Sequence, residues 1–195
     1  MDTNNTPTKN QTSSLAYQFL IAMPGLHGSG FSGSITYLCQ HTEEGAFGVV
    51  INRRSNILLG EVMQQMSIKD VNDEIINLPV FDGGPVEPER GFILHQPFGE
   101  WDSTLKMTDS ISLTTSRDIL EAIAIKQGPQ QFLIALGYAG WGAKQLEQEI
   151  IDNAWLNVPG DSSILFETPV EQRSKVAAAN LGVDLSILTT QVGHA

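Results

Sequence analysis

The chain has 195 residues and is acidic, with 22 Asp and Glu against 11 Lys and Arg, so its formal net charge is −11. Its length is usual for one domain with its own hydrophobic core. Binding to nucleic-acid phosphates or anionic lipid heads requires clustered Lys and Arg. Arg53 and Arg54 are the only adjacent basic pair, which argues against direct nucleic-acid binding and against binding to a membrane surface.

The N-terminal residues differ from the rest of the chain. Residues 1–14 are rich in Thr, Asn, Ser and Gln, which predicts a disordered tail before a single domain over residues 15–195. They lack the basic start and apolar core of a secretory signal. Cys39 is the single cysteine, so no intramolecular disulfide can form and the thiol suits a reducing cytosol. No apolar run approaches the roughly 18 residues of a membrane span. We therefore expect a cytoplasmic protein.

The first half of the chain has mainly the pattern of strands. Apolar runs rich in β-branched and aromatic residues, bounded by turn residues, are typical of buried strands. One stretch instead spaces its apolar residues three and four apart, which predicts a helix. In chain order we expect strands at Tyr17–Met23, Ser34–His41 and Ala46–Asn52, with a hairpin turn at Glu43–Gly45, then a helix at 58–67, a surface loop at 67–78, and strands at Pro79–Asp82 and Gly91–Gln96 with a turn at Glu87–Arg90.

The second half mixes helices with strands. Thr168 and Glu171 have the spacing of a capping box. The order of elements favours an α+β domain over strict βαβ alternation. We expect a strand at Ile111–Thr114, a helix capped by Thr115 or Ser116, a strand at Gln131–Tyr138, a helix after Gly140–Gly142 with an apolar stripe from Ala143 to Trp155, a short strand at Ile164–Glu167, and a last helix from Thr168 to Gly182.

A glycine-rich stretch at Gly28–Gly33 matches GxGxxG and follows a predicted strand. A dinucleotide site also needs a helix there and an acidic residue at the end of the next strand. That strand is followed instead by Arg53 and Arg54, so a glycine-permitted loop is favoured. The near match to GxSxG at Gly30–Ser34 is broken at its last position. A nucleophile elbow also needs a histidine late in the chain, and the candidate, His194, lies beside the C-terminus.

Cys39 and His41 are two residues apart, and on a strand they would share a face. Such a pair can be a nucleophile, or with His27 or His95 can bind a metal. The histidines lack zinc-site spacing, and a lone cysteine among apolar neighbours is usually a small buried hydrophobe. We therefore expect no metal site and no cofactor.

Polar side chains gather where predicted strands end. Loops held by a rigid scaffold commonly present ligand contacts. An amide, forked guanidinium donors and an imidazole suit a small anion. The alternative is structural, because glycine-rich bends and buried polar struts serve a curled sheet equally well. The candidate ligand-binding residues are Asn52, Arg53, Asp82, Arg90, His95, Tyr138 and Trp141.

Eight segments in order resemble the YqgE/AlgH family of small bacterial proteins. The resemblance implies an α+β fold in which a bifurcated, mostly antiparallel sheet curls into a pseudo-barrel with helices packed around it. It carries no established biochemical activity and no catalytic residue. Some members are labelled transcriptional regulators, without a recognisable DNA-binding motif. The segments are Phe19–Pro24, Tyr37–His41, Gly45–Arg53, Gly83–Val86, Arg90–His95, Leu113–Leu120, Ala135–Ala143 and Asn153–Leu156.

Three functional hypotheses follow. The first is a non-enzymatic binding or regulatory protein that contacts a protein or a small ligand. The second is an enzyme acting on a small anionic substrate through Arg53, Arg90, His95 and Cys39, which requires these groups to converge on one cavity. The third is direct regulation by DNA binding, which the charge of −11 disfavours.

Overall fold

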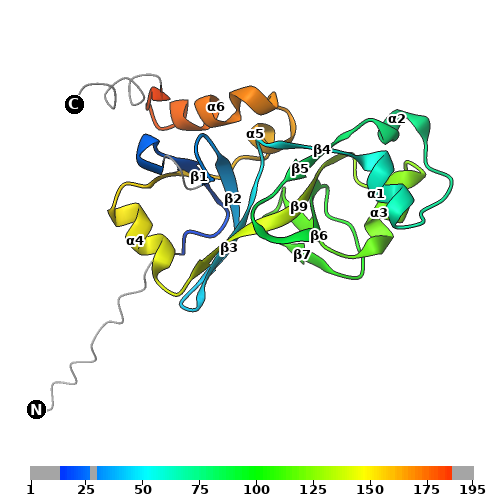
Figure 1. The fold of residues 1–195 in the computed structure, drawn as a ribbon, viewed down its shortest axis with the longest axis horizontal. Coiled ribbons are helices and arrows are strands. Elements are labelled where there is room, and N and C mark those ends of the chain that lie inside the picture. The colour runs from blue at the N-terminus through cyan, green and yellow to red at the C-terminus, as the bar shows by residue number, and fades with distance from the viewer. Residues whose placement is uncertain (1–13, 27–29, 186–195) are drawn as a thin grey trace, which may run out of the picture.

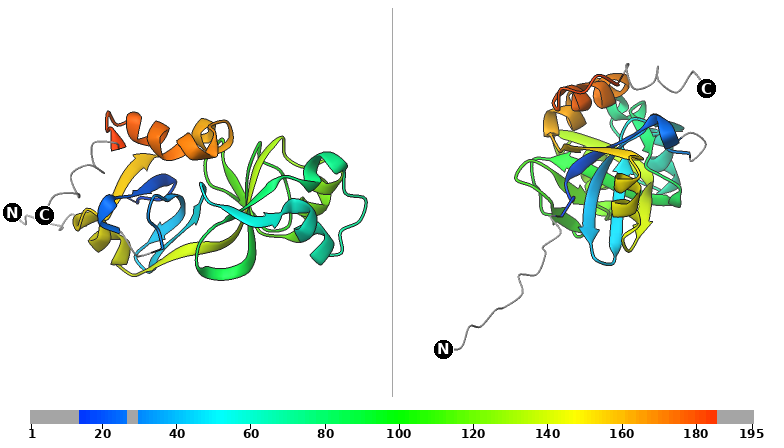
Figure 2. Two further views of the ribbon diagram at one scale, coloured as in Figure 1. Left: turned by 45° about the horizontal axis from the view of Figure 1, so that its top comes forward. Right: turned by 90° about the vertical axis from the view of Figure 1, so that its left-hand side faces the viewer.

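Two lobes lie end to end and share one curled sheet (Figures 1 and 2). The computed structural model describes residues 14–26 and 30–185, so the predicted tail lies outside the described residues apart from Ser14. The first lobe contains β1 (Gln18–Ala22), η1 (Pro24–Leu26), β2 (Ile35–Thr42), β3 (Gly45–Val50), α4 (Gln145–Ile151), β10 (Trp155–Pro159), α5 (Ser162–Phe166), η2 (Val170–Gln172) and α6 (Arg173–Ala179).

The second lobe carries its helices at its far end (Figure 1). The long strand β9 (Gln131–Gly142) runs from this lobe into the first. The remaining elements of the second lobe are β4 (Arg54–Leu58), α1 (Leu59–Gln65), α2 (Asp73–Ile76), β5 (Pro79–Asp82), β6 (Val86–Gln96), β7 (Thr104–Lys106), β8 (Ser112–Thr114) and α3 (Arg117–Ala124).

The sheet branches along β9. The order of its strands is β10-β1-β2-β3-β9-β6-β8-β7, and β5 pairs with both β4 and β9 outside that path. Leu136 of β9 lies opposite Gly91 of β6 and Asp82 of β5, whereas Ala139 lies opposite Gly48 of β3. Among the strands of the described residues, only the β5–β9 pair is parallel. The α+β class and the bifurcated, mostly antiparallel sheet are therefore confirmed.

Glycines make the branch possible. Gly84 and Gly137 have φ angles of +142° and +74°, which L-residues rarely adopt. A Cβ on Gly84 would lie 2.3 Å from the carbonyl carbon of Tyr138, and one on Gly83 would lie 2.2 Å from the carbonyl oxygen of Gly137. The Gly83 N–H donates to Leu136, and its carbonyl accepts from Val50. The backbones of β3, β5 and β9 thus meet where no side chain fits.

The hydrophobic core has three parts. The largest cluster draws on strands of both lobes, including Tyr37 and Leu94, and on α5 and α6. A second cluster packs α1 and α3 against the sheet through residues such as Met63 and Ile119. A third lies beneath α4 and contains Trp155. The predicted strand Ser34–His41 (β2) and the helix 58–67 (α1) are confirmed. The helix buries Leu59, Val62 and Met63, whereas Leu58 precedes it and is exposed.

Two predictions in the C-terminal part are wrong. Residues 164–167 belong mostly to the helix α5 and not to a strand, because Asp161 caps it by accepting from the Ser163 N–H at 2.8 Å. The helix expected to reach Trp155 ends at Ile151. Trp155 instead begins β10 and pairs with Ala22 of β1. Pairing with a strand distant in sequence thus overrides an apolar spacing that suits a helix.

Smaller differences concern turns and caps. The predicted loop at 67–78 contains the short helix α2, capped by Asn72. The predicted turn at Glu87–Arg90 is part of β6, where the register shifts between Val86 and Gly91. The capping box at Thr168 does not form, since no side chain caps η2, and the Thr168 hydroxyl donates to the Ser163 carbonyl at 3.2 Å. The strands β4 and β7 carry little buried apolar surface and were not predicted.

Candidate functional site

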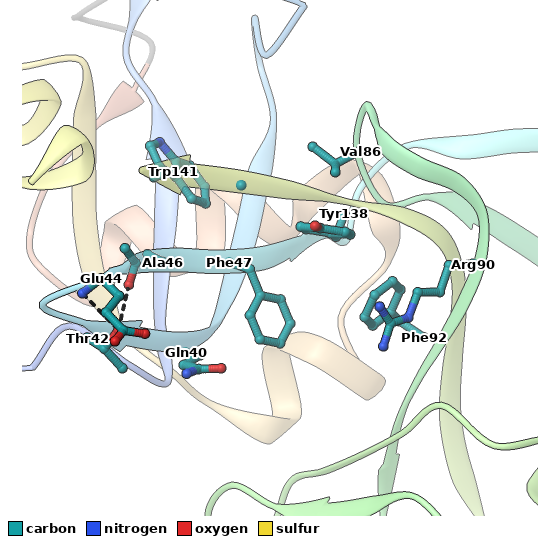
Figure 3. A pocket seen from close by; sticks show the side chains of 12 residues that line it. Gln40, Thr42, Glu44, Ala46, Phe47, Val86, Arg90, Phe92, Tyr138 and Trp141 are labelled. Atoms are coloured by element: carbon teal, nitrogen blue, oxygen red, sulfur yellow. Dashed lines mark hydrogen bonds between the residues drawn. The ribbon is translucent and has the colours of Figure 1, made fainter. Parts of the chain in front are cut away.

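A cleft of about 500 Å³ lies over the branch of the sheet, where β3, β6 and β9 meet (Figure 3). The tip of the β2–β3 hairpin forms one end of it and the bulged part of β6 forms the other. Its lining residues are Gln40, Thr42, Glu44, Gly45, Ala46, Phe47, Val86, Arg90, Phe92, Tyr138, Gly140 and Trp141.

Three aromatic rings form the wall of the cleft. The ring centroid of Tyr138 lies 5.8 Å from that of Phe47 and 5.6 Å from that of Phe92, and both pairs meet edge to face. Phe47 and Phe92 are 6.2 Å apart. Phe47 and Tyr138 are half-buried, whereas Phe92 is buried. Each edge-to-face pair contributes about 0.5–1.5 kcal/mol beyond the area that it buries, which favours this arrangement of the three rings.

Opposite charges stand at the two ends of this wall (Figure 3). The Arg90 guanidinium carbon lies 5.3 Å from the centroid of the Phe92 ring, and Nη1 donates to Glu87 Oε2 at 3.0 Å. Both partners of this ion pair are about half exposed, so the pair contributes little to stability. Glu44 lies at the hairpin end and has no ion-pair partner in the part of the chain that the structure describes.

The structure brings three of the seven candidate residues together in this cleft: Arg90, Tyr138 and Trp141. Trp141 also has a structural contact, because its indole N–H donates to Glu149 Oε2 at 2.8 Å. The indole N–H of Trp155 donates to the same oxygen at 2.8 Å. Glu149 therefore fixes α4 to the sheet beside the hairpin end of the cleft.

Asn52 and Arg53 hold the segment before β2. Asn52 Oδ1 accepts from the Ile35 N–H at 3.0 Å, and Nδ2 donates to the Gly33 carbonyl at 2.9 Å. The Arg53 guanidinium donates to the carbonyls of Gly30 and Ser32. The amide and the guanidinium, which the sequence analysis assigned to a ligand, thus form hydrogen bonds within the protein. Both side chains support the backbone of this segment.

Asp82 is exposed at the end of β5, away from the lining of the cleft. Its carboxylate accepts from the Gly84 N–H at 3.3 Å. This is the local turn chemistry of aspartate before glycine, and it supports the close approach of Gly84 to β9.

His95 is fully buried in the second lobe. Its Nδ1 lies 3.2 Å from the Pro97 carbonyl, which can only accept, so Nδ1 carries the hydrogen. Nε2 then accepts from the Thr114 hydroxyl at 2.9 Å. The ring meets Trp101 edge-on at 5.0 Å. Burial lowers the pKa of His95 below 6.5, although the bond to Pro97 opposes this shift.

We expect the stability of the protein to fall as pH drops below about 6.5, because unfolded His95 binds a proton there that folded His95 does not. The contribution of neutral His95 is fully present above that pH. Urea unfolding between about pH 7 and pH 5 measures the slope, and His95→Gln should flatten it. An unchanged slope in this variant would assign the effect to other groups.

Cys39 and His41 do not form a pair. The register between β2 and β3 shifts between Leu38 and Gln40, which places the two side chains on different sides of the strand. Cys39 is buried, and burial raises the pKa of its thiol. His41 Nε2 lies 3.1 Å from Glu147 Oε1, and Nδ1 accepts from the Leu15 N–H. The bulge thus overrides the two-residue periodicity of a strand.

The convergence required for the predicted enzyme does not occur. Of its four groups only Arg90 lines the cleft, whereas Arg53, His95 and Cys39 are held elsewhere. The first two residues of the glycine motif, as well as His27 and His194, lie outside the described residues. The strand β2 follows that motif where a dinucleotide site needs a helix.

Among residues 14–26 and 30–185, no three His, Cys, Asp or Glu side chains gather closely enough to hold a metal ion. Within the same ranges, every helix is too short or too polar to cross a membrane.

Sequence reasoning missed several residues of the cleft, above all Phe47, Phe92, Gln40 and Glu44. The predicted hairpin turn at Glu43–Gly45 was the available signal, since a tight hairpin places Gln40 opposite Phe47. An apolar ring on an open face has the same sequence pattern as one in the core, however. Only the packing of the helices shows which face stays open.

The comparisons with known proteins agree with one another. A family model described as AlgH-like matches residues 19–186. A UPF0301 protein of Methylococcus capsulatus is 55% identical over 180 residues, covering 92% of this chain and 96% of the relative. One from Nitrosococcus oceani is 51% identical over 177 residues, covering 91% and 95%. The solution structure of AlgH from Pseudomonas aeruginosa has a TM-score of 0.79 at 45% identity, covering 97% of this chain and all of that one. A Corynebacterium diphtheriae protein, with a TM-score of 0.68 at 20% identity over 97% of this chain and 94% of its own, shares the fold.

Proposed function

Since the chain belongs to the AlgH-like family, which has no specific biochemical function assigned, we propose from the site itself that this is a non-enzymatic binding protein. Its ligand is a small molecule with an apolar body that lies in the cleft against Phe47, Phe92 and Tyr138. The protein acts in the cytoplasm, where its single cysteine stays reduced.

The three aromatic rings that form the wall of the cleft carry this proposal. Ligand sites are concave and mostly apolar, with a few polar groups that set orientation. Phe47 and Tyr138 remain half-buried above the branch, so a ligand that covers them removes apolar surface from water. The polar groups at the rim, an amide on Gln40 and a guanidinium on Arg90, suit recognition. The residues best suited to proton transfer or nucleophilic attack, His95 and Cys39, are buried away from the cleft.

Anilinonaphthalene sulfonate, an aromatic anion, is a suitable fluorescent probe for the cleft. We expect saturable fluorescence enhancement with one site per chain. Phe47→Ala should weaken the affinity about tenfold, because the variant loses most of one ring face worth roughly 1.5 kcal/mol. Fluorescence titration of the folded protein measures both values.

Phe98→Ala is the matched control, because Phe98 is 48% exposed and does not line the cleft. Its titration should equal that of the unmodified chain. If the Phe47 and Phe98 variants bind the probe equally well, the cleft is not the site. If the cleft binds a protein and not a small molecule, that protein should displace the probe and small molecules should not.

A further inference from the structure

We propose that the ligand of this cleft is a short peptide in extended conformation, with its amino group at Glu44 and its carboxylate at Arg90. This inference rests on the proposed function and names the ligand class of the same site. It is carried by two opposite charges at the ends of one row of rings (Figure 3).

The strand register sets the spacing of these charges. Glu44 precedes Gly45, which lies opposite Gly142 of β9, and Arg90 precedes Gly91, which lies opposite Leu136. Positions 136 and 142 are about 20 Å apart along a strand. The Glu44 and Arg90 side chains reach inward from the two ends (Figure 3), so the charges lie closer together than the backbone positions. A peptide of a few extended residues, at about 3.3–3.6 Å per residue, suits such a span.

The middle of the cleft suits a peptide as well. Gln40 lies between the charged ends and is exposed (Figure 3). Its amide makes no hydrogen bond to another residue of the described chain and offers one donor group and one acceptor, as a peptide bond requires. Phe47 and Tyr138 offer ring faces to an apolar central side chain.

The ion pair at Arg90 can be exchanged for a ligand carboxylate. Arg90 and Glu87 are about half exposed, so separating them costs little. Glu87 has a φ of +46°, in the bulged segment of β6 beside the cleft. Glu87 thus competes with the ligand for the guanidinium, and its removal should favour a ligand that carries a carboxylate.

The test uses the tripeptide Ala-Phe-Ala, titrated into isotope-labelled full-length protein and followed by NMR chemical shifts. The same peptide is titrated with an acetylated amino group, with an amidated carboxylate, and with both. We expect each modification to weaken binding about fivefold, the value of one half-exposed charge pair.

Variants assign each charge to one end. Glu44→Gln should weaken the free peptide about fivefold but leave the acetylated peptide unchanged. Arg90→Gln should weaken the free peptide about fivefold but leave the amidated peptide unchanged. Glu87→Gln should tighten binding only when the peptide carboxylate is free. Arg54→Gln is the matched control, because Arg54 is similarly exposed and also pairs with a glutamate, Glu171.

The outcomes separate this inference from the proposed function. Equal binding of all four peptides, still weakened by Phe47→Ala, overturns the assignment of the two ends and leaves the proposed function standing. Binding of anilinonaphthalene sulfonate without binding of Ala-Phe-Ala overturns the peptide class. Failure of both probes overturns the proposed function together with this inference.

Discussion

Gly84→Ala is expected to lower the free energy of unfolding by about 3 kcal/mol or more, the largest effect of any single change considered for this protein. The φ angle of +142° at Gly84 is strained for alanine. The added Cβ would also lie 2.3 Å from the carbonyl carbon and 2.4 Å from the carbonyl oxygen of Tyr138. These are backbone atoms of β9 and are held by pairing with β3 and β6, so they cannot move aside singly.

Gly91→Ala is the control for this substitution. Gly91 lies on the adjoining strand β6, has no left-handed φ, and has no heavy atom within 4 Å of an added Cβ. Its substitution should change stability by no more than about 0.5 kcal/mol. Urea denaturation of the two variants measures the difference. Equal midpoints would mean that the backbone contact at the branch is not what requires glycine.

The branch and the cleft share these residues. Tyr138 follows Gly137 and presents its ring to the cleft, while its carbonyl lies against Gly84. A partly folded Gly84→Ala protein should therefore also lose affinity for the aromatic probe. The branch of the sheet thus requires glycines in these segments, and the same branch positions the residues of the proposed site.

Arg173→Ala is expected to cost about 3 kcal/mol, the second largest effect. Arg173 begins α6 and is 6% exposed. Its guanidinium donates to the carbonyls of Ile51 and Thr168 and lies 5.4 Å from the centroid of the Phe81 ring. Alanine leaves the Ile51 carbonyl without this donor and removes the packing on the ring.

The buried charge explains why so many contacts surround Arg173. Burial, with the charge of Arg54 adding to it, lowers the pKa of Arg173 to about 10, and Glu171 opposes the shift. The side chain is therefore still a cation at neutral pH. Arg54→Ala is the control, because Arg54 is 55% exposed and should cost less than about 1 kcal/mol. Thermal melts in which the two variants lose equal stability would contradict the role given to Arg173.

Sequence patterns located the long, well-buried elements of this protein. The run from Ser34 to His41 forms most of β2, because its apolar residues suit a strand that is buried inside the sheet. The helix expected after Ser116 is α3, because its apolar stripe predicts one buried face. The short elements α5 and β10 were predicted wrongly. Their few residues have weak local preferences, so capping by Asp161 and pairing with β1 decide their structure.

The candidate site was predicted only in part. Arg90, Tyr138 and Trp141 were nominated because polar and aromatic residues at strand ends commonly contact ligands, and they meet in one cleft. His95 has the same sequence signal, yet Thr114 and Pro97 bind both of its nitrogens in the core. A polar residue that supports the fold cannot be told from one that binds a ligand until its partners are known.

The sequence by itself determined the acidic charge, the family and the well-buried strands of the sheet, because these depend on composition, ordered motifs and local apolar patterns. Only the tertiary structure decided which residues share a site. Phe47, Arg90 and Tyr138 belong to three strands far apart in the chain, and they meet because β9 pairs with β3 and β6 at fixed registers. Those registers depend on closure of the whole sheet around glycines that leave no room for a side chain.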